Sequence, residues 1–543
     1  MKKLIALFLC IGFLAGVVSC SPRMDMNDYQ SQNANWLKCD QALLQRGIQS
    51  KIFKESHVDC ASILVPADYS KPTTSKAFKI QMMRVHRANP SKLRGSIFIN
   101  PGGPGGSGIE QLQSSNFPKS LLAHYDIIGF DPRGVGHSKF SDGTEIKCDD
   151  RLDLESYFKS EGSPANLKEY KANIAISDAY LKDCAKRNPF WWTLSTQNVV
   201  DDLELMRLVV TGGQNLNFIG SSYGTTIAGM YVTRYPNHVG KIVLDSPTDV
   251  DGYSYESALE SAKAMESKLK VYLSNYSKKS DITFHEAWLR LLKFKQRADD
   301  DKLIGFAGIK FDEVTWEHRI SSESLLVHGI QALSYMPEEE ATKEFSTAMD
   351  ELQSQDWNAA FEWYALSLDG YDPESLIKDS WEPRNIVRSN SYEIMSIVNA
   401  MDFSPKTDDG EVVTSYIDVQ KKVAPMWTQL NLDSNGYEYL GPDLGLSWAE
   451  IARRDPKIPD PPSESTPRFN YSHKPLLIVG SLHEAVTPFK FARTTAKQLN
   501  SPLISVESTN HAPAAGYDIP CLNKILLNYF LSDSVIRSQY CSR

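Results

Sequence analysis

A five-residue segment at residues 220–224 constrains this chain more than any other feature of the sequence. It reads Gly-Ser-Ser-Tyr-Gly and stands between an apolar run at residues 216–219 and a helix-like stretch at residues 225–234. A serine held in a sharp strand-to-helix turn needs glycine neighbours, because the crowded backbone leaves no room for side chains. The pattern predicts that Ser222 is an exposed nucleophile. A Gly/Ser loop can match the same five residues by chance, so the surrounding sequence has to decide.

Short apolar runs and helix-like stretches alternate on both sides of this segment, which predicts an α/β fold with a mostly parallel sheet covered by helices on both faces. A helix is expected at residues 196–210, where apolar residues recur at helical spacing. We expect strands at residues 62–65, 79–84, 96–99, 127–130, 216–219 and 241–244.

After residue 250 the strand pattern gives way to helix-like stretches at residues 255–276, 282–298 and 358–368, which predict a large helical lid inserted before the last strands. Prolines at residues 456–467 indicate a stiff connector. Strands at residues 475–479 and 503–506, around a helix at 488–499, then resume the sheet. The predicted division is a signal peptide at 1–19, the core at 20–250, the lid at 251–467 and the rest of the core at 468–543.

The N-terminus has the pattern of an export signal. Lys2 and Lys3 precede an apolar stretch at residues 4–18 that is too short to span a membrane. The following Ser19-Cys20 resembles a bacterial lipobox, so we expect lipid to be attached at Cys20; ordinary cleavage nearby is the alternative. By resemblance to Gram-negative lipoproteins, Ser21 favours the outer membrane. The expected location is therefore the cell envelope. Whether the protein faces the periplasm or the cell surface is left open by the sequence.

Charge and cysteine usage narrow the class of protein further. The formal net charge is −9 and no basic run is present, which argues against nucleic acid as a partner. Six cysteines outside the N-terminal segment form sequence-local pairs. In an oxidising compartment these predict three disulfides rather than a zinc site, whose usual ligand spacing is absent. Nothing in the sequence requires a metal or cofactor. The expected pairs are Cys39 with Cys60, Cys148 with Cys184, and Cys521 with Cys541.

A serine nucleophile needs a histidine base and a carboxylate that orients the histidine. His511 follows the expected strand at 503–506, and Glu484 follows the one at 475–479. Asp245 ends the strand at 241–244 and is the rival acid. The negative charge that develops on the substrate oxygen needs two backbone donors, which we assign to the amides of Tyr223 and Gly103, the latter in a glycine-rich loop at residues 100–108.

The order of these motifs resembles the tripeptidyl aminopeptidase and prolyl aminopeptidase group of alpha/beta hydrolases. The likeness runs through the glycine loop, Tyr125 to Ser138 (YDIIGFDPRGVGHS), the helix at 196–207, the serine motif and residues 243–245. Residues 475–541 resemble the C-terminal domain of that group. Two departures stand out. Glu484 occupies the place of the usual aspartate, and residues 399–402 only loosely match a lid motif of the group.

The resemblance implies an alpha/beta hydrolase that removes single residues or tripeptides from the free N-terminus of a peptide through a Ser-His-acid acyl-enzyme mechanism. Such an enzyme needs lid carboxylates to pair with the substrate ammonium group. The candidates are Glu338, Glu339, Glu340 and Asp402, although an acidic run is also typical of a solvated helix face. Two alternatives stay open: a lipoprotein carboxylesterase with the same triad, and a non-catalytic peptide-binding surface protein.

Overall fold

The structure is a computed structural model of the chain. It describes residues 24–44, 49–73, 76–86, 93–148, 175, 179–180, 182–249, 255–299, 310–311, 314–315, 323–355, 361, 364–365, 367, 389–402, 418–431, 469–532 and 534–542. The expected signal peptide at 1–19, the lipidation candidate Cys20 and the proline-rich connector at 456–467 lie outside these residues, as does most of the expected helix at 358–368.

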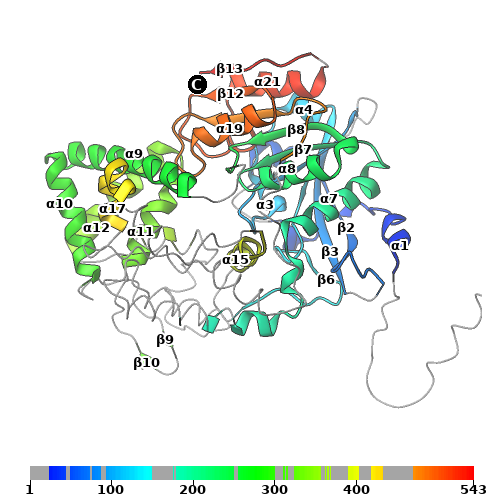
Figure 1. Cartoon of the computed structure of the whole chain (residues 1–543), viewed down its shortest axis with the longest axis horizontal. Helices are drawn as coiled ribbons and strands as arrows, with labels where there is room; N and C mark the ends of the chain where they lie inside the picture. Colours follow the sequence, from blue (N-terminus) through cyan, green and yellow to red (C-terminus); the bar gives the residue numbers. More distant parts are fainter. Residues whose placement is uncertain are drawn as a thin grey trace, which may run out of the picture.

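An 11-stranded sheet forms the centre of the molecule (Figure 1). Its strands, in spatial order, are β1 (Leu37–Lys38), β2 (His57–Pro66), β3 (Ala77–His86), β5 (Tyr125–Phe130), β4 (Gly95–Asn100), β7 (Leu216–Ser221), β8 (Val239–Asp245), β11 (Leu477–Ser481), β12 (Leu503–Val506) and β13 (Gln539–Cys541), with β6 (Lys139–Phe140) paired to β3. From β5 to β13 all neighbours are parallel, whereas β1, β2, β3 and β6 add an antiparallel side.

The mostly parallel α/β sheet predicted from the sequence is therefore confirmed. The expected strands at 62–65 and 79–84 are the middle of one long antiparallel pair, in which Ile63 lies opposite Ile80. The short strands β1, β6 and β13 were not predicted. Each has only two or three residues, which is too few to produce a visible alternation of apolar and polar side chains.

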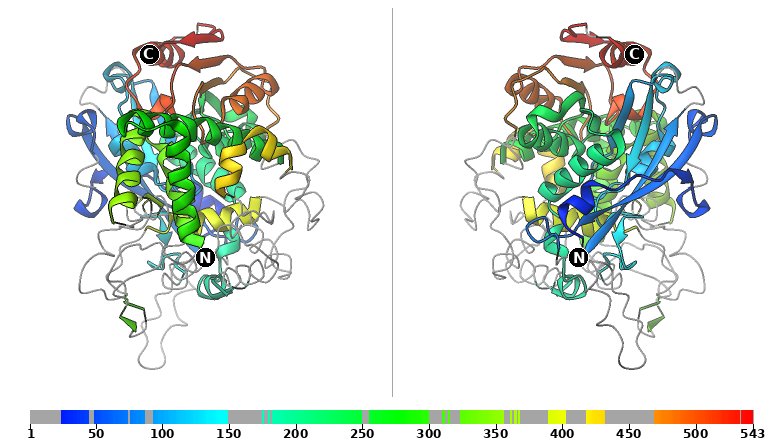
Figure 2. Two further views of the ribbon diagram at one scale, coloured as in Figure 1. Left: turned by 90° about the vertical axis from the view of Figure 1, so that its left-hand side faces the viewer. Right: turned by 90° about the vertical axis from the view of Figure 1, so that its right-hand side faces the viewer.

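Helices cover both faces of the sheet, as the two side views in Figure 2 show. Successive residues of a strand point to opposite faces. Thus Phe98 in β4 packs in the cluster beneath one set of helices, while its neighbours Ile97 and Ile99 pack beneath the other. The first set is α7 (Thr196–Thr211), α8 (Gly224–Arg234) and α19 (Phe489–Gln498); the second is α3 (Gly108–Ser114), α4 (Lys119–Leu122) and α21 (Pro520–Leu531).

A separate group of helices lies beside the sheet and has its own apolar cluster (Figure 1). Residues such as Tyr272, Leu291 and Phe345 are fully buried in it. One core residue, Ala485, belongs to the same cluster, so the loop that follows β11 is inserted into the lid. The lid helices are α9 (Tyr255–Lys279), α10 (Phe284–Asp299), α11 (Glu323–Ala332), the 3-10 turn η5 (Leu333–Tyr335), α12 (Glu338–Gln355) and α17 (Pro425–Asn431).

Helix α15 (Ser391–Asp402) differs from the other lid helices because its apolar face packs on the core. Ile394, Ile397 and Val398 join the cluster that also contains α7 and α8. The lid also holds a short strand pair, β9 (Lys310–Phe311) with β10 (Val314–Thr315), where no strand was expected.

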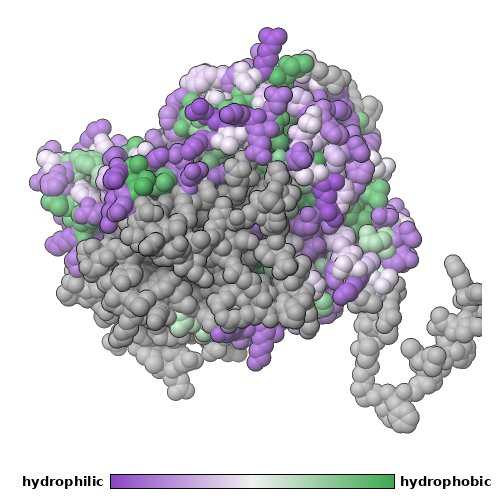
Figure 3. Space-filling model, viewed as in Figure 1, coloured by the Kyte–Doolittle hydropathy of each residue, from purple (hydrophilic) through white to green (hydrophobic). Residues whose placement is uncertain are grey.

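All three predicted disulfides are present. They join Cys39 to Cys60, Cys148 to Cys184, and Cys521 to Cys541. The third links the start of α21 to the edge strand β13. The described surface seen in Figure 3 is mostly hydrophilic with small scattered apolar spots. Among the described helices, none combines the length and apolar character needed to cross a membrane.

Candidate active site

Ser222 lies at the sharp turn between β7 and α8. Its φ is 54°, in the left-handed region, and its amide donates to the carbonyl oxygen of Asp245 at 3.0 Å. A side chain at Gly220 would come within 2.2 Å of the carbonyl oxygen of Gly224, and one at Gly224 within 2.6 Å of that of Asn100. Both flanking positions therefore exclude any residue larger than glycine, as expected for a strained nucleophile turn.

The glycine-rich loop after β4 packs directly on this turn. A Cβ added at Gly102 would lie 2.7 Å from the amide nitrogen of Tyr223 and 2.9 Å from Cβ of Ser222, so the two backbones are in contact. The amide of Gly102 already donates to Oδ1 of Asn100 at 2.9 Å. The next amide, that of Gly103, was assigned to the oxyanion from the sequence, and this role stays a prediction. The close approach at Gly102 was missed, because a run of glycines does not indicate which one touches its neighbour.

Asp131, directly after β5, anchors the far side of the glycine loop. Its carboxylate accepts hydrogen bonds from the Ser107 hydroxyl, from the amide of Ile109 at 3.3 Å and from the amide of His137 at 2.9 Å. Complete burial raises the pKa of Asp131 to about 6. The loop is therefore tied both to the nucleophile turn and to the sheet.

His511 and Glu484 come together at the carboxyl edge of the sheet. They follow the adjacent parallel strands β12 and β11, and such strands end at the same edge. The ring Nδ1 of His511 lies 2.6 Å from Oε2 of Glu484. The Glu484 side chain is fully buried and that of His511 is 11% exposed. This geometry suits a carboxylate that fixes the orientation of an imidazole base.

Both oxygens of Glu484 accept additional hydrogen bonds. The Thr487 hydroxyl donates to Oε2 at 2.9 Å, and the Ser246 hydroxyl donates to Oε1 at 2.6 Å. No local pattern indicated Ser246, because 238 residues separate it from Glu484. Neighbouring His483 points elsewhere and lies 2.8 Å from Oε1 of Glu507.

Asp245, the rival acid, is directed to other partners. Its Oδ2 accepts from the amides of Ala514 at 2.9 Å and Ala515 at 3.3 Å, and from the Ser221 hydroxyl at 3.3 Å. Burial, together with the nearby charge of Glu484, raises the pKa of Asp245 to about 7. Of the two candidate acids, the structure therefore brings Glu484 to the ring of His511.

The lid contacts the site through Tyr335, at the end of η5. Its ring lies edge-on to that of His511, with centroids 5.7 Å apart, and the side chain is 44% exposed. This exposed aromatic ring beside the predicted base was not anticipated, since nothing local distinguishes Tyr335 from the other aromatic residues of the lid.

The four lid carboxylates proposed from the sequence have different surroundings. Glu338 pairs with Lys268 at 3.1 Å, within the lid. Asp402 accepts from the amide of Thr196 at 3.1 Å and from the Thr196 hydroxyl, which also contacts the hydroxyl of Tyr223. The other two, Glu339 and Glu340, lie exposed on the first turn of α12. Two of the four thus already have structural partners.

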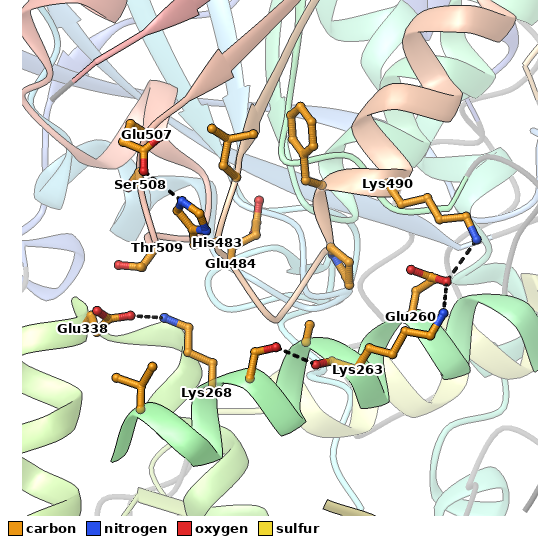
Figure 4. Close-up of a pocket in the computed structure, with 16 residues that line it drawn as sticks. Glu260, Lys263, Lys268, Glu338, His483, Glu484, Lys490, Glu507, Ser508 and Thr509 are labelled. Carbon is orange, nitrogen blue, oxygen red and sulfur yellow. Dashed lines mark hydrogen bonds and ion pairs between the residues drawn. The ribbon is translucent and has the colours of Figure 1, made fainter. Parts of the chain in front are cut away.

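A cleft of about 620 Å³ opens between α9 and the loops after β11 and β12 (Figure 4). Glu484 lines it, whereas Ser222 and His511 are not among its lining residues. Ion pairs also line it: Glu260 binds both Lys263 at 2.7 Å and Lys490 at 3.1 Å. The second of these joins the lid to α19 of the core. Within the described residues, no group of three or more His, Cys, Asp or Glu side chains could hold a metal ion.

Two family comparisons agree with this architecture. Residues 95–284 match the alpha/beta hydrolase fold family, and residues 448–541 match the family described as TAP-like protein. The chain thus has the alpha/beta hydrolase fold, with a TAP-like C-terminal region.

Three similar proteins are named for different activities. Tripeptidyl aminopeptidase of Streptomyces coelicolor is 30% identical over 251 residues, which cover 43% of this chain and 45% of the relative. This chain therefore spans less than half the length of that relative. Serine protease Hip1 of Mycobacterium tuberculosis is 26% identical over 484 residues, covering 87% of this chain and 85% of the relative. Carboxylesterase B of Mycobacterium tuberculosis is 23% identical over 487 residues, covering 88% and 84%.

Proposed function

We propose that this protein is an exported serine exopeptidase that releases residues or tripeptides from the free N-terminus of peptides. The observation that carries the proposal is the 2.6 Å contact between His511 and Glu484. It lies at the same sheet edge as the strained turn of Ser222, because β7 and β8 run parallel to β11 and β12. The peptidase relatives support a peptide rather than another acyl compound as the substrate.

In the proposed acylation step, Oγ of Ser222 attacks the carbonyl carbon of the scissile peptide bond. His511 takes the hydroxyl proton, while Glu484 holds the ring and stabilises its positive charge. The amides of Gly103 and Tyr223 donate to the oxyanion. When the C–N bond breaks, His511 returns the proton to the leaving amine. The products are an ester on Ser222 and a peptide with a new N-terminus.

In the proposed deacylation step, water replaces the leaving amine beside His511. The imidazole takes a proton from this water as its oxygen attacks the ester carbon, and the same two amides hold the second oxyanion. The ester bond to Ser222 then breaks, and His511 returns the proton to Oγ. The released fragment carries the new carboxylate, and the enzyme regains its starting state.

An exopeptidase of this kind must also bind the substrate ammonium group. The lid carboxylates remain our candidates, and the exposed pair Glu339 and Glu340 is favoured because Glu338 and Asp402 are engaged with Lys268 and Thr196. The first turn of α12 begins three residues after Tyr335, whose ring meets His511. A carboxylate there lies on the part of the lid next to the site.

Two experiments test the proposal. A fluorophosphonate probe should label the wild-type protein and leave Ser222→Ala unlabelled, whereas equal labelling of both would remove the mechanism. A chromogenic panel of aminoacyl, tripeptidyl and short acyl-ester substrates then defines the substrate. Peptide turnover should be lost when the substrate amine is acetylated, since the acetylated amine no longer carries a positive charge.

A carboxylesterase is the second candidate, favoured by the relative named Carboxylesterase B, which matches over most of both chains. In that case the ester substrates of the panel would be turned over and the peptides would not. A non-catalytic peptide-binding protein, the third alternative, would give no probe labelling at all.

Attachment to the cell envelope through lipid on Cys20 is part of the proposal, with the outer membrane as the expected location. Radiolabelled palmitate should be incorporated into the full chain and not into Cys20→Ser. Recovery of the wild-type protein in the soluble fraction without label would refute the anchor and leave the peptidase mechanism untouched.

A further inference from the structure

We propose that Asp245, the last residue of β8, and Ser246, which follows it, are positioning residues. They hold the loop that carries His511 (the histidine loop) and the acid Glu484 in catalytic alignment. This inference rests on the proposed function. It gives Asp245 a role different from that of an alternative acid, and it gives Ser246 a role that the sequence did not indicate.

Ser246 connects three separate parts of the chain. Its hydroxyl donates to Oε1 of Glu484 at 2.6 Å and accepts from the amide of Ala512 at 3.0 Å. Its own amide donates to the carbonyl oxygen of Val479 in β11 at 2.9 Å. The residue is 1% exposed and has a left-handed φ of 52°. A non-glycine residue persists in that conformation only when the surrounding contacts hold it there.

Asp245 binds residues that follow His511 in the same loop region. Its Oδ2 accepts from the amides of Ala514 and Ala515, which lie in the short helix α20 (Pro513–Gly516). Ser246 and Asp245 therefore bind residues 512, 514 and 515, directly after His511. On the preceding side, the Ser481 hydroxyl donates to the carbonyl oxygen of Asn510 at 2.6 Å. Buried hydrogen bonds thus hold the loop on both sides of the histidine.

The hydrogen bonds of Ser246 also restrict the movement of the Glu484 carboxylate. A glutamate has one more rotatable bond than an aspartate, so its carboxylate loses more freedom when it must hold an imidazole at a fixed position. The Ser246 hydroxyl fixes the oxygen of Glu484 that His511 does not contact, and the same hydroxyl fixes the residue after His511. Acid and base therefore share one anchor, which keeps their separation constant.

Kinetic comparison of Ser246→Ala with the wild-type enzyme tests the role. We expect kcat per active site, counted by fluorophosphonate titration, to fall about ten- to a hundredfold, the usual range for losing one hydrogen bond to a charged group. KM should change less than roughly twofold, because no substrate contact is removed. The rate of fluorophosphonate labelling should fall with kcat. Unchanged kcat per titrated site would overturn the proposal.

Ser501→Ala is the matched control, since Ser501 precedes β12 at the opposite edge of the sheet. Its hydroxyl is partly buried, donates to the carbonyl oxygen of Leu499 at 3.0 Å and accepts from the amide of Leu476 at 3.0 Å. This variant should lower the unfolding temperature and leave kcat per titrated site unchanged. If it lowers kcat as much as Ser246→Ala does, the effect is a general response to a lost hydrogen bond and the positioning role is refuted.

If Ser246→Ala does not fold, two variants of Asp245 still test the inference. Asp245→Asn keeps an oxygen that accepts from Ala514 and Ala515, so it should retain most of the kcat that Asp245→Ala loses. Equal loss in both variants would contradict the role of Asp245.

In a Glu484→Gln background, Ser246→Ala should lower kcat much less than in the wild type, because the effects of coupled residues are not additive. An undiminished drop would refute action through Glu484.

These outcomes are distinguishable from failure of the proposed function. If wild-type protein is not labelled by the probe, or if Ser222→Ala is labelled equally, the serine mechanism itself fails. If labelling depends on Ser222 and Ser246→Ala behaves as wild type, only the positioning role fails.

Discussion

The ring Nδ1 of His511 lies 2.6 Å from Oε2 of Glu484, although 27 residues separate the two along the chain. The strands that precede them, β12 and β11, are parallel neighbours, which brings the following loops to one edge of the sheet. Thr487 strengthens the arrangement, because its hydroxyl lies 2.9 Å from the same Glu484 oxygen and 3.3 Å from the same ring nitrogen.

The contact between Glu484 and His511 predicts that Glu484, and not Asp245, orients the imidazole base. Glu484→Gln should lower kcat/KM about 10³- to 10⁴-fold, the loss typical of a triad acid replaced by its amide. Asp245→Asn should lower it less than about tenfold, because Asp245 holds the loop and does not contact the ring. Steady-state kinetics on one peptide substrate, with folding checked by circular dichroism, makes the comparison. The opposite ranking would transfer the role of the acid to Asp245.

The raised pKa of Asp245 predicts a particular dependence of stability on pH. In the folded protein this carboxyl keeps its proton to about pH 7, whereas in the unfolded chain it loses the proton near its ordinary value of 3.8. Between these values the unfolded state binds fewer protons, so the contribution of Asp245 to stability falls as pH rises. Asp245→Asn removes this contribution.

Urea unfolding between about pH 4 and pH 7.5 measures this effect. The unfolding free energy of Asp245→Asn minus that of the wild type should increase with pH across this window. Other titrating groups, such as Asp131, are present in both proteins and cancel in the difference. Two curves that stay parallel would show that Asp245 titrates normally in the folded state.

A second buried carboxylate, Asp202, forms a fully enclosed ion pair with Arg133. Their side chains are 2% and 0% exposed, and Nε of Arg133 donates to Oδ2 at 2.8 Å. Asp202→Asn should lower the unfolding free energy by about 3–5 kcal/mol, because it leaves a buried guanidinium uncompensated. The control is the half-exposed pair Lys76 and Asp142, where Asp142→Asn should cost less than about 1 kcal/mol. Similar losses in both pairs would mean that burial does not set the difference.

The disulfide between Cys521 and Cys541 should stabilise the C-terminal edge of the sheet. Replacing both cysteines by alanine is expected to lower the unfolding free energy by about 3 kcal/mol, the value for a loop of this size. The pair Cys39 and Cys60 closes a loop of nearly equal length, with separations of 21 and 20 residues, so its removal should cost a similar amount. Denaturant unfolding measures both, and a loss below about 1 kcal/mol for either would contradict the estimate.

Tyr335 is expected to shape the leaving-group side of the site, because its exposed ring lies against the imidazole that protonates the leaving amine. Tyr335→Ala should raise KM for peptide substrates roughly three- to tenfold, the worth of one lost aromatic contact. Labelling by a small fluorophosphonate should change less than about twofold. Leu289→Ala, at an exposed position in α10 that is 49% accessible, serves as the control. Equal effects of the two variants would refute a local role for Tyr335.

Much of this architecture was accessible from local patterns. Strand-length apolar runs and the helix at 196–210 predicted the parallel sheet, and short cysteine spacings predicted the three disulfides, all of which the structure confirms. The short edge strands were not predicted, because a strand of two or three residues is too short to show an alternation of apolar and polar side chains. Ser222 was selected by its glycine-flanked strand-to-helix turn, and Glu484 and His511 by their places after late strands, in the chain order serine, acid, histidine. Their catalytic roles stay a prediction.

The five residues at 220–224, with the apolar run before them and the helix-like stretch after them, determined the serine turn, since a Cβ added at either flanking glycine would lie only 2.2 to 2.6 Å from a backbone oxygen. The tertiary structure decided which acid meets His511, which glycine touches the turn, and which lid carboxylates already have partners. It also revealed Ser246, whose two side-chain hydrogen bonds span 238 and 266 residues. Contacts of that range depend on how strands and loops stack in space, and no local period in the sequence records them.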